Sequence, residues 1–333
     1  MSKQRVKIVS STDGKEIIET ALLKRITEVN TIGHNKPTFV QFGEGDYREG
    51  YWKNSSKTSH SFFDKLEYII CQIGRKLGIK MATTYKVYDE SGFCGIISQN
   101  VLNDNEQMYL ASQLKGLIQE PSDRLKNYIS ECNIIFQEHL VEFVSANGNV
   151  WNIPVLESEE DIEKILEAFP RVIIELEPNK EKQLKIISDY YQMIMLDLIT
   201  NNVDRSNNNY GIIIDEFRNI RFTPLFDNST IRIPGIPNNG RRIYGTIVDR
   251  DKLLRVLFKS HYEYIKSIAE RCCDDREEIL TSIRKICNQE LSERDANEFL
   301  QTITNNILAI SILVEQYRNG TIVEPTPENE NIK

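Results

Sequence analysis

The sequence has little of what metal centres and disulfide-bonded scaffolds need. Its 333 residues include only four histidines, and its six cysteines, at positions 71, 94, 132, 272, 273 and 287, contain no C-x-x-C pair. Zinc sites need closely spaced Cys or His ligands, and disulfide scaffolds need an ordered set of cysteines. Neither is therefore expected, and the cysteines are predicted to be the reduced thiols of a cytoplasmic protein.

The chain also lacks an excess of positive charge, and it lacks a long apolar run near its first residue. The net charge is −8 and the isoelectric point is about 5.3, whereas proteins that bind nucleic acids or membrane surfaces directly are usually basic. The first residues, MSKQRVKIVSSTDGK, contain no apolar run, so no signal peptide or transmembrane helix is expected. We predict no direct binding of nucleic acid and none of membranes. The hydrophobic content of 40% fits a globular chain long enough for two cores.

One stretch, residues 197–229, carries the chemistry of the chain. It reads DLITNNVDRSNNNYGIIIDEFRNIRFTPLFDNS, which predicts the end of an apolar helix, an Asn-rich loop, a hairpin over 210–225 and then an Asp. Asp204 can orient an acceptor hydroxyl, while Asn209 and Asp227 offer the side-chain oxygens that Mg²⁺ prefers. This order is typical of the phosphoryl-transfer site of protein kinases. The alternative is an ordinary hairpin, because Asn and Asp are common in turns.

Two segments, NNVDRSNNNYGII and FTPLFDNS, resemble the catalytic core of the HipA-like serine/threonine kinases. In that family an N-x-D-R element replaces the usual HRD, and the metal-binding Asp lies in a P-x-x-D segment. The matching positions here are Asn202, Asp204, Arg205, Asn209 and Asp227. The resemblance implies that ATP and Mg²⁺ are bound, that Asp204, Asn209 and Asp227 are catalytic, and that Asn209 and Asp227 are the metal ligands. The family often has His after the Arg, where this chain has Ser, but the three catalytic side chains are present.

A lysine and a glutamate in the first hundred residues resemble the pair that orients nucleotide phosphates in kinases. Lys53 lies on a predicted strand, and Glu67 lies on a helix predicted over residues 61–77. Their positions match the strand lysine and helix glutamate of the family, and such a pair holds the α- and β-phosphates. Taken singly, a Lys and a Glu are usually solvated.

Two further nucleotide contacts follow from the resemblance alone. Gly33 is matched to the phosphate loop, although a plain turn is the alternative because Lys36 and Pro37 stand in the reverse of the family order. Ser98, Gln99 and Asn100 are matched to the segment that meets the adenine edge.

Periodicity of the apolar residues predicts the remaining elements. Strands are expected at 6–10, 38–42, 51–53, 83–88 and 93–98, and helices at 17–29, 122–145, 158–169, 182–200, 251–271, 275–288 and 293–318. Residues 228–250 lack periodicity and predict a mobile loop. Its arginines, Arg232, Arg241 and Arg242, are candidates for holding phosphate or an acidic partner, and a solvated basic loop is the alternative.

Together these features predict an α+β protein with the two-lobed protein-kinase-like fold. Residues 1–102 are expected to form a lobe with a small antiparallel sheet, residues 103–320 a mostly helical lobe, and residues 321–333 a disordered tail. The predicted function is transfer of the ATP γ-phosphoryl group to a hydroxyl, with Ser or Thr of a protein as the first choice of acceptor. The HipA-like family includes toxins of toxin–antitoxin pairs, so the resemblance also implies an antitoxin partner. A catalytically silent binding module of the same fold and a kinase of small molecules or lipids are the alternatives.

Overall fold

The structure is a computed structural model that describes residues 3–12, 15–28, 37–44, 47–54, 61–144, 150–202, 205–228, 240–243 and 246–322. The chain forms two compact units, and each is described by itself. The first contains Met1–Asp104, Pro224–Thr230 and Ser282–Leu300, and the second contains Asn105–Thr223, Ile231–Thr281 and Gln301–Lys333. The domain limits predicted at 102 and 320 stay predictions, and the predicted tail lies beyond the described residues apart from its first two positions.

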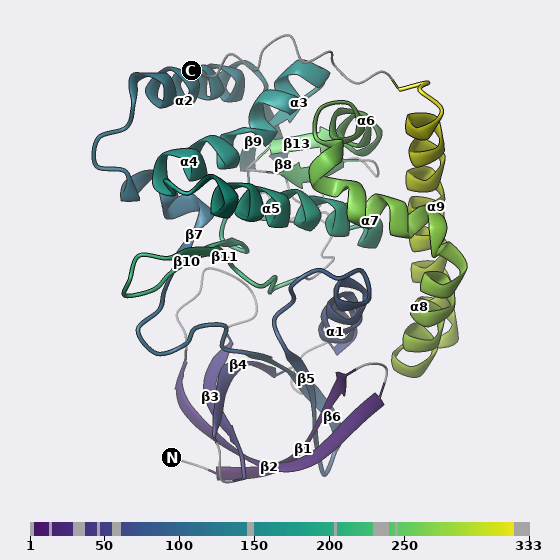
Figure 1. Ribbon diagram of the computed structural model, residues 1–333. Helices are drawn as coiled ribbons and strands as arrows, with labels where there is room; N and C mark the ends of the chain where they lie inside the picture. Colours follow the sequence, from purple (N-terminus) through teal and green to yellow (C-terminus); the bar gives the residue numbers. More distant parts are fainter. Residues whose placement is uncertain are drawn as a thin grey trace. The chain divides into compact units, whose positions relative to one another are not determined.

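A closed six-stranded antiparallel barrel forms the centre of the first unit (Figure 1). Its strands follow the order β1-β2-β3-β4-β6-β5, with bounds Lys3–Thr12 (β1), Lys15–Glu28 (β2), Thr38–Gly43 (β3), Arg48–Asn54 (β4), Thr84–Asp89 (β5) and Gly92–Gln99 (β6). The barrel closes where β1 pairs with β5, which places Ile8 opposite Val87. Alternate side chains point inward along the strands and form the core, among them Val6, Ile8 and Trp52.

Strand β2 replaces the helix that the sequence predicts over residues 17–29, so that prediction is wrong. Ala21 and Leu23 lie two positions apart and are fully buried in the barrel, whereas Ile17 and Ile18 are more than half exposed. A helix would have placed Ile17, Ile18 and Ala21 on one buried face. The apolar residues fit a helical period, but β1 and β3 pair with β2 on its two sides. Pairing with neighbouring strands has therefore overridden the local periodicity.

Helix α1, Ser61–Lys76, packs on β5 and β6 through a buried apolar stripe that includes Leu66, Ile69 and Ile73. The segment Pro224–Thr230, which begins at the end of the predicted hairpin, belongs to this unit too. Leu225 forms an isolated parallel bridge with Met81, and its N–H donates to the Lys80 carbonyl at 2.9 Å.

The second unit is mostly helical and is built on α5, Lys180–Thr200, whose residues 193–200 are all buried. The other helices of the chain are a 3₁₀ helix at Ala111–Leu117, α2 (Asp123–Glu138), α3 (Glu159–Leu166), α4 (Ala168–Leu176), α6 (Arg250–Ser260), α7 (Tyr262–Asp274), α8 (Arg276–Glu290) and α9 (Glu293–Arg318). Two small sheets have the orders β11-β10-β7 and β12-β13-β9-β8. Their strands are β7 (Gln107–Leu110), β8 (Leu140–Val144), β9 (Val150–Leu156), β10 (Gly211–Ile214), β11 (Ile220–Phe222), β12 (Gly240–Ile243) and β13 (Thr246–Asp249).

Three predictions for this unit need correction. The helix expected over 122–145 ends at Glu138, because the next residues pair with β9 as strand β8. The helix expected over 251–271 is two helices, divided at His261, whose φ of −134° is not helical. Part of the loop expected over 228–250 forms β12 and β13, and β13 pairs with β9, about 90 residues earlier in the chain. In the last case the deciding contact is distant in sequence.

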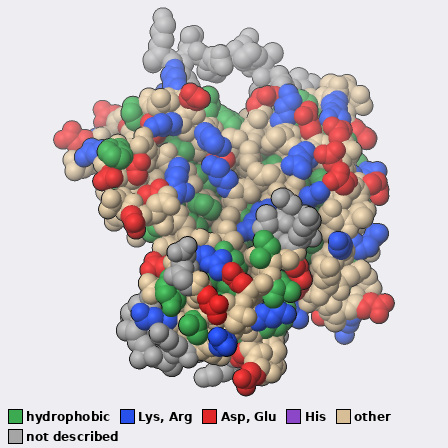
Figure 2. Space-filling model, turned by 60° about the horizontal axis from the view of Figure 1, so that its bottom comes forward, with side chains coloured by type: hydrophobic (Ala, Val, Ile, Leu, Met, Phe, Trp, Pro, Cys, Tyr) green, Lys and Arg blue, Asp and Glu red, His purple; other side chains and the backbone are tan. Residues whose placement is uncertain are grey.

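The prediction of a mixed α and β protein, with its sheet in the amino-terminal part and its helices in the carboxy-terminal part, is confirmed. Among the described residues, no helix combines the length and apolar character needed to cross a bilayer. On the face shown in Figure 2, acidic and basic side chains are interspersed.

Candidate active site

Lys53 binds two carboxylates in the first unit. Its ammonium nitrogen, Nζ, lies 2.5 Å from Glu67 Oε2 and 2.7 Å from Asp227 Oδ1. Lys53 comes from β4, Glu67 from α1, and Asp227 from the short piece after the hairpin. The structure thus brings together three of the predicted site residues, although Asp227 is 174 positions from Lys53.

The three charges differ in how far water reaches them. The side chain of Glu67 is 2% exposed and that of Lys53 is 16% exposed, whereas the Asp227 side chain is 42% exposed. Burial alone would lower the pKa of Lys53, but the negative charges of Glu67 and Asp227 outweigh it and hold this pKa above its ordinary value. Burial raises the pKa of Glu67, and Lys53 opposes that rise only in part. Lys53 is therefore positively charged. Its ammonium group is fixed by the buried Glu67 and also contacts the more exposed Asp227.

The backbone around Asp227 is held in an uncommon conformation. Asp227 has a φ of 50°, which non-glycine residues rarely adopt outside functional or tightly held positions. The carbonyl of Leu225 accepts the Ala82 N–H at 2.9 Å on one side. On the other, Asn228 is fully buried and its amide donates to Cys71 Sγ at 3.6 Å. Burial raises the pKa of Cys71 to about 11, so this cysteine is a packed thiol and not a nucleophile.

In the second unit, Asp197 organises the loop that follows α5. Its carboxylate accepts hydrogen bonds from Arg205 Nε at 2.8 Å and Nη2 at 2.7 Å, and from the Asn202 amide at 2.8 Å. The side chain of Arg205 is only 2% exposed. Asn201 ends the helix with a left-handed φ of 58°. Asp197 was not among the predicted site residues, although a lone carboxylate in the last turn of an apolar helix is a signal that could have identified it.

The same loop presents Asn209. Its backbone N–H donates to Ser206 at 2.9 Å and its carbonyl accepts from Arg205 at 3.4 Å, while its side-chain amide makes no hydrogen bond to any described residue. Asp204 lies outside the described residues, so its predicted role stays a prediction. Gly211 begins β10, and a Cβ there would lie 2.0 Å from the Tyr109 carbonyl oxygen. Only glycine therefore permits this strand to pair with β7.

The remaining predicted nucleotide contacts stay predictions. Gly33 lies outside the described residues, as does Arg232, and of Arg241 and Arg242 the structure describes only the backbone, in β12. Ser98 is buried in β6. The backbone N–H groups of Gln99 and Asn100 donate to Thr83 and Glu49 at 2.7 and 2.8 Å, so these donors are used within the unit.

Side-chain oxygens suited to Mg²⁺ are present, although among the described residues no three Asp, Glu, His or Cys side chains cluster as a metal site. Such a cluster is not needed for Mg²⁺, because proteins usually hold this ion through one or two carboxylates together with phosphate oxygens and water. The carboxylate of Asp227 and the amide oxygen of Asn209 are ligands of the required kind.

Comparison with known proteins shows the fold. No protein-family model and no curated protein matches the chain. Among solved structures, the chain is similar to the Helicobacter pylori proinflammatory kinase CtkA, with 13% identity and a TM-score of 0.51 over 86% of this chain and 94% of that one. The fold is kinase-like.

A structure of the Shewanella oneidensis HipA, HipB and operator DNA toxin–antitoxin complex also matches, with 11% identity and a TM-score of 0.42 over 88% of this chain and 66% of the matched one. The predicted kinase-like fold is confirmed by the likeness to the CtkA structure.

Proposed function

We propose that this kinase-like protein transfers the γ-phosphoryl group of ATP to a hydroxyl in a reaction that requires Mg²⁺. The observation that carries the proposal is the contact of Lys53 with both Glu67 and Asp227. Phosphate positioning requires a fixed cation, and metal binding requires an accessible carboxylate. Lys53, held between the buried Glu67 and the more exposed Asp227, brings the two together. No packing role needs Asp227 to be 42% exposed and in a left-handed conformation.

In this proposal each side chain has a distinct task. Lys53, fixed by Glu67, supplies positive charge to phosphate oxygens. Asp227 is proposed as a ligand of Mg²⁺, which when bound neutralises phosphate charge. Two further roles are proposed from the sequence pattern. Asp204 orients the acceptor hydroxyl, and Asn209 is a second metal ligand. Catalysis would then rest on positioning and electrostatics, without a covalent enzyme intermediate.

The buried pair of Asp197 and Arg205 supports this assignment indirectly. It fixes the loop that carries Asn209, because Arg205 also donates to the Asn209 carbonyl. A Ser or Thr of a protein as the acceptor, and an antitoxin as a partner, rest on the resemblance to the HipA-like kinases.

The direct test is incubation of the full chain with Mg²⁺ and labelled ATP, alone and with cell lysate, followed by mapping of the phosphorylated sites. We expect Asp227→Ala and Asp204→Ala each to lose roughly 10²-fold or more in rate, since they remove metal charge and hydroxyl orientation. Lys80→Met, a change at an exposed lysine, is the matched control and should stay active. Near-wild-type turnover by a folded Asp227→Ala variant would refute the proposal. Binding of Mg-ATP by the parent without turnover would indicate the silent binding module.

Asn209 provides a separate test of the metal site. Asn209→Asp keeps an oxygen ligand and should retain part of the activity with an altered preference between Mg²⁺ and Mn²⁺, whereas Asn209→Leu should be nearly inactive. If Asn209 only shapes a turn, Asn209→Gly should preserve activity with an unchanged metal response. Titration of the two metals against the three variants distinguishes these outcomes.

A further inference from the structure

The 3₁₀ helix Ala111–Leu117 holds the loop that carries Asn209. The first N–H groups of a helix have no partner within the helix. Here the Ala111 N–H donates to the Tyr210 carbonyl at 2.9 Å, and the Ser112 N–H donates to the Asn207 carbonyl at 3.1 Å. The Ser112 hydroxyl adds a third bond, to Asn208 Oδ1 at 2.7 Å, although the two residues are 96 positions apart. Residues 207–210 are therefore held from outside the loop at three points.

The three consecutive asparagines of this loop differ in what their side chains contact. The side-chain oxygen of Asn207 accepts the Tyr210 hydroxyl at 3.1 Å. The side-chain oxygen of Asn208 accepts the Ser112 hydroxyl. The side-chain amide of Asn209 makes no hydrogen bond to any described residue. The first two asparagines are thus fixed by the protein, and the third is available to a ligand.

The two groups that fix the loop differ in burial. Tyr210 is buried and its ring lies against Phe169 and Tyr190, with centroids 5.7 and 5.9 Å away. Ser112 is exposed, so water can replace its hydroxyl in solvating Asn208. Loss of the Ser112 hydroxyl should therefore loosen the loop without unfolding the second unit.

We propose that Ser112 is a positioning residue for Asn209. This inference rests on the proposed function, in which Asn209 is a metal ligand. Because Asn207 and Asn208 are fixed, the backbone of Asn209 has few other conformations to lose when its side-chain oxygen binds Mg²⁺. A ligand group that is held in advance binds more tightly, since less conformational entropy is lost on binding.

The test measures how phosphotransfer by the full chain depends on Mg²⁺ at a fixed concentration of ATP. Ser112→Ala should raise the half-saturating Mg²⁺ concentration about 3- to 10-fold, the range that one neutral hydrogen bond supplies, and leave kcat at saturating Mg²⁺ close to that of the parent. Ser112→Thr keeps the hydroxyl and should behave like the parent. Binding of Mn²⁺ in the presence of ATP, followed by water-proton relaxation, gives the metal affinities without turnover.

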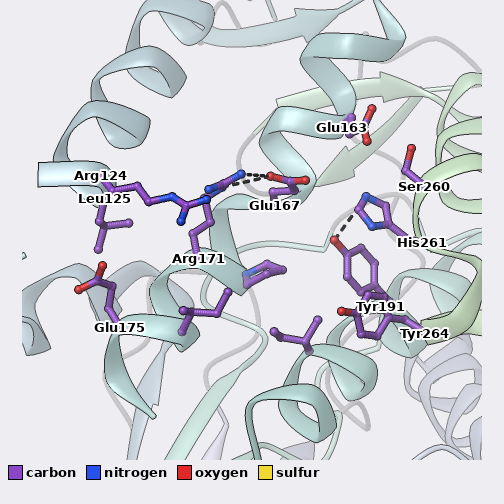
Figure 3. Close-up of a pocket in the computed structure, with 13 residues that line it drawn as sticks. Arg124, Leu125, Glu163, Glu167, Arg171, Glu175, Tyr191, Ser260, His261 and Tyr264 are labelled. Atoms are coloured by element: carbon purple, nitrogen blue, oxygen red, sulfur yellow. Dashed lines mark hydrogen bonds and ion pairs between the residues drawn. The ribbon is translucent and has the colours of Figure 1, made fainter. Parts of the chain in front are cut away.

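Ser260→Ala is the matched control, because it removes another serine hydroxyl from the second unit. Ser260 lies beside His261 in a pocket of about 430 Å³ whose lining includes none of the residues predicted for catalysis or nucleotide binding (Figure 3). Its hydroxyl makes no hydrogen bond to any residue that the structure describes. This variant should keep the metal dependence of the parent.

A double variant tests whether Ser112 acts through Asn208. Asn208→Ala should raise the half-saturating Mg²⁺ concentration as Ser112→Ala does, and the two changes together should add little, because both remove one hydrogen bond. Thermal unfolding checks that each variant is folded. An active parent whose metal dependence is matched by a folded Ser112→Ala variant would overturn the role of Ser112 alone, as would additive effects or a fall in kcat without a change in metal dependence. A folded parent with neither phosphotransfer nor metal binding in the presence of ATP would overturn the proposed function and this inference with it.

Discussion

Replacement of Lys53 by methionine is a sharp test of the electrostatics in the first unit. Methionine has a similar length but no charge, so the change leaves Glu67 and Asp227 without their shared cation. The two carboxylates should respond differently, because the Glu67 side chain is 2% exposed and that of Asp227 is 42% exposed. Water can solvate Asp227, and most of the cost should therefore come from Glu67.

The expected loss of stability in Lys53→Met follows from the free-energy cost of a buried charge that has lost its partner. Breaking such a pair on one side costs about 3–5 kcal/mol near neutral pH. Burial already raises the pKa of Glu67, and removal of Lys53, which opposes that rise, should raise it further. When the pKa of a carboxyl is higher in the folded than in the unfolded protein, the group stabilises the fold most at a pH below its unfolded pKa. This stabilisation is lost as the pH rises through the folded pKa. The deficit of Lys53→Met should thus be small near pH 4 and grow towards pH 8.

The assay is urea unfolding followed by tryptophan fluorescence, since Trp52 is buried in the barrel core. Free energies of unfolding are compared between parent and variant from pH 4 to 8. Lys80→Met is the control at an exposed lysine and should show no pH-dependent deficit. Lys53→Met combined with Glu67→Leu should recover much of the loss and remove its pH dependence, because no buried charge remains. A deficit that is constant over this pH range would refute the reasoning.

Three further predictions concern the second unit and use the same unfolding measurement. Asp197→Ala should cost about 3–5 kcal/mol because it removes the carboxylate that neutralises the buried Arg205, and replacing Arg205 by methionine as well should restore part of this loss; additive losses would contradict this. Gly211→Ala should cost about 2 kcal/mol or more, since the new Cβ would lie 2.0 Å from the Tyr109 oxygen, whereas Gly116→Ala, where no atom lies within 4 Å, should be nearly neutral. His261, with a pKa lowered from 6.5 to about 4, should destabilise the protein as pH falls from about 6.5 to 4, because only the unfolded chain gains that proton. His261→Phe should remove this part of the acid sensitivity, about 2–3 kcal/mol, and an unchanged acid profile would show that the ring titrates freely.

The parts of the site that could be predicted are those in which local pattern and chemistry agree. Lys53 and Glu67 were predicted as a pair, and the structure joins them at 2.5 Å. Asp227 was predicted from its place after the hairpin, and it binds the same lysine. The role of Asp197 in fixing the loop was not predicted. A carboxylate in an apolar helix has no evident function until its partner, Arg205, eight residues later, is known. The pocket lined by His261 could not be predicted for the same reason, since its lining residues come from six helices, α2 to α7.

The sequence by itself determined the long helices and the order of helix, loop and hairpin. Helices α5 and α9 match their predicted ranges to within two residues. Helical hydrogen bonds are local, and the period of the apolar residues can be recognised directly in the sequence. Only the tertiary structure decided that residues 15–28 are a strand, that β8 follows α2, and that the sheet closes into a barrel. A strand makes its hydrogen bonds to another strand and not within itself, so the partner, and not the local pattern, selects the strand.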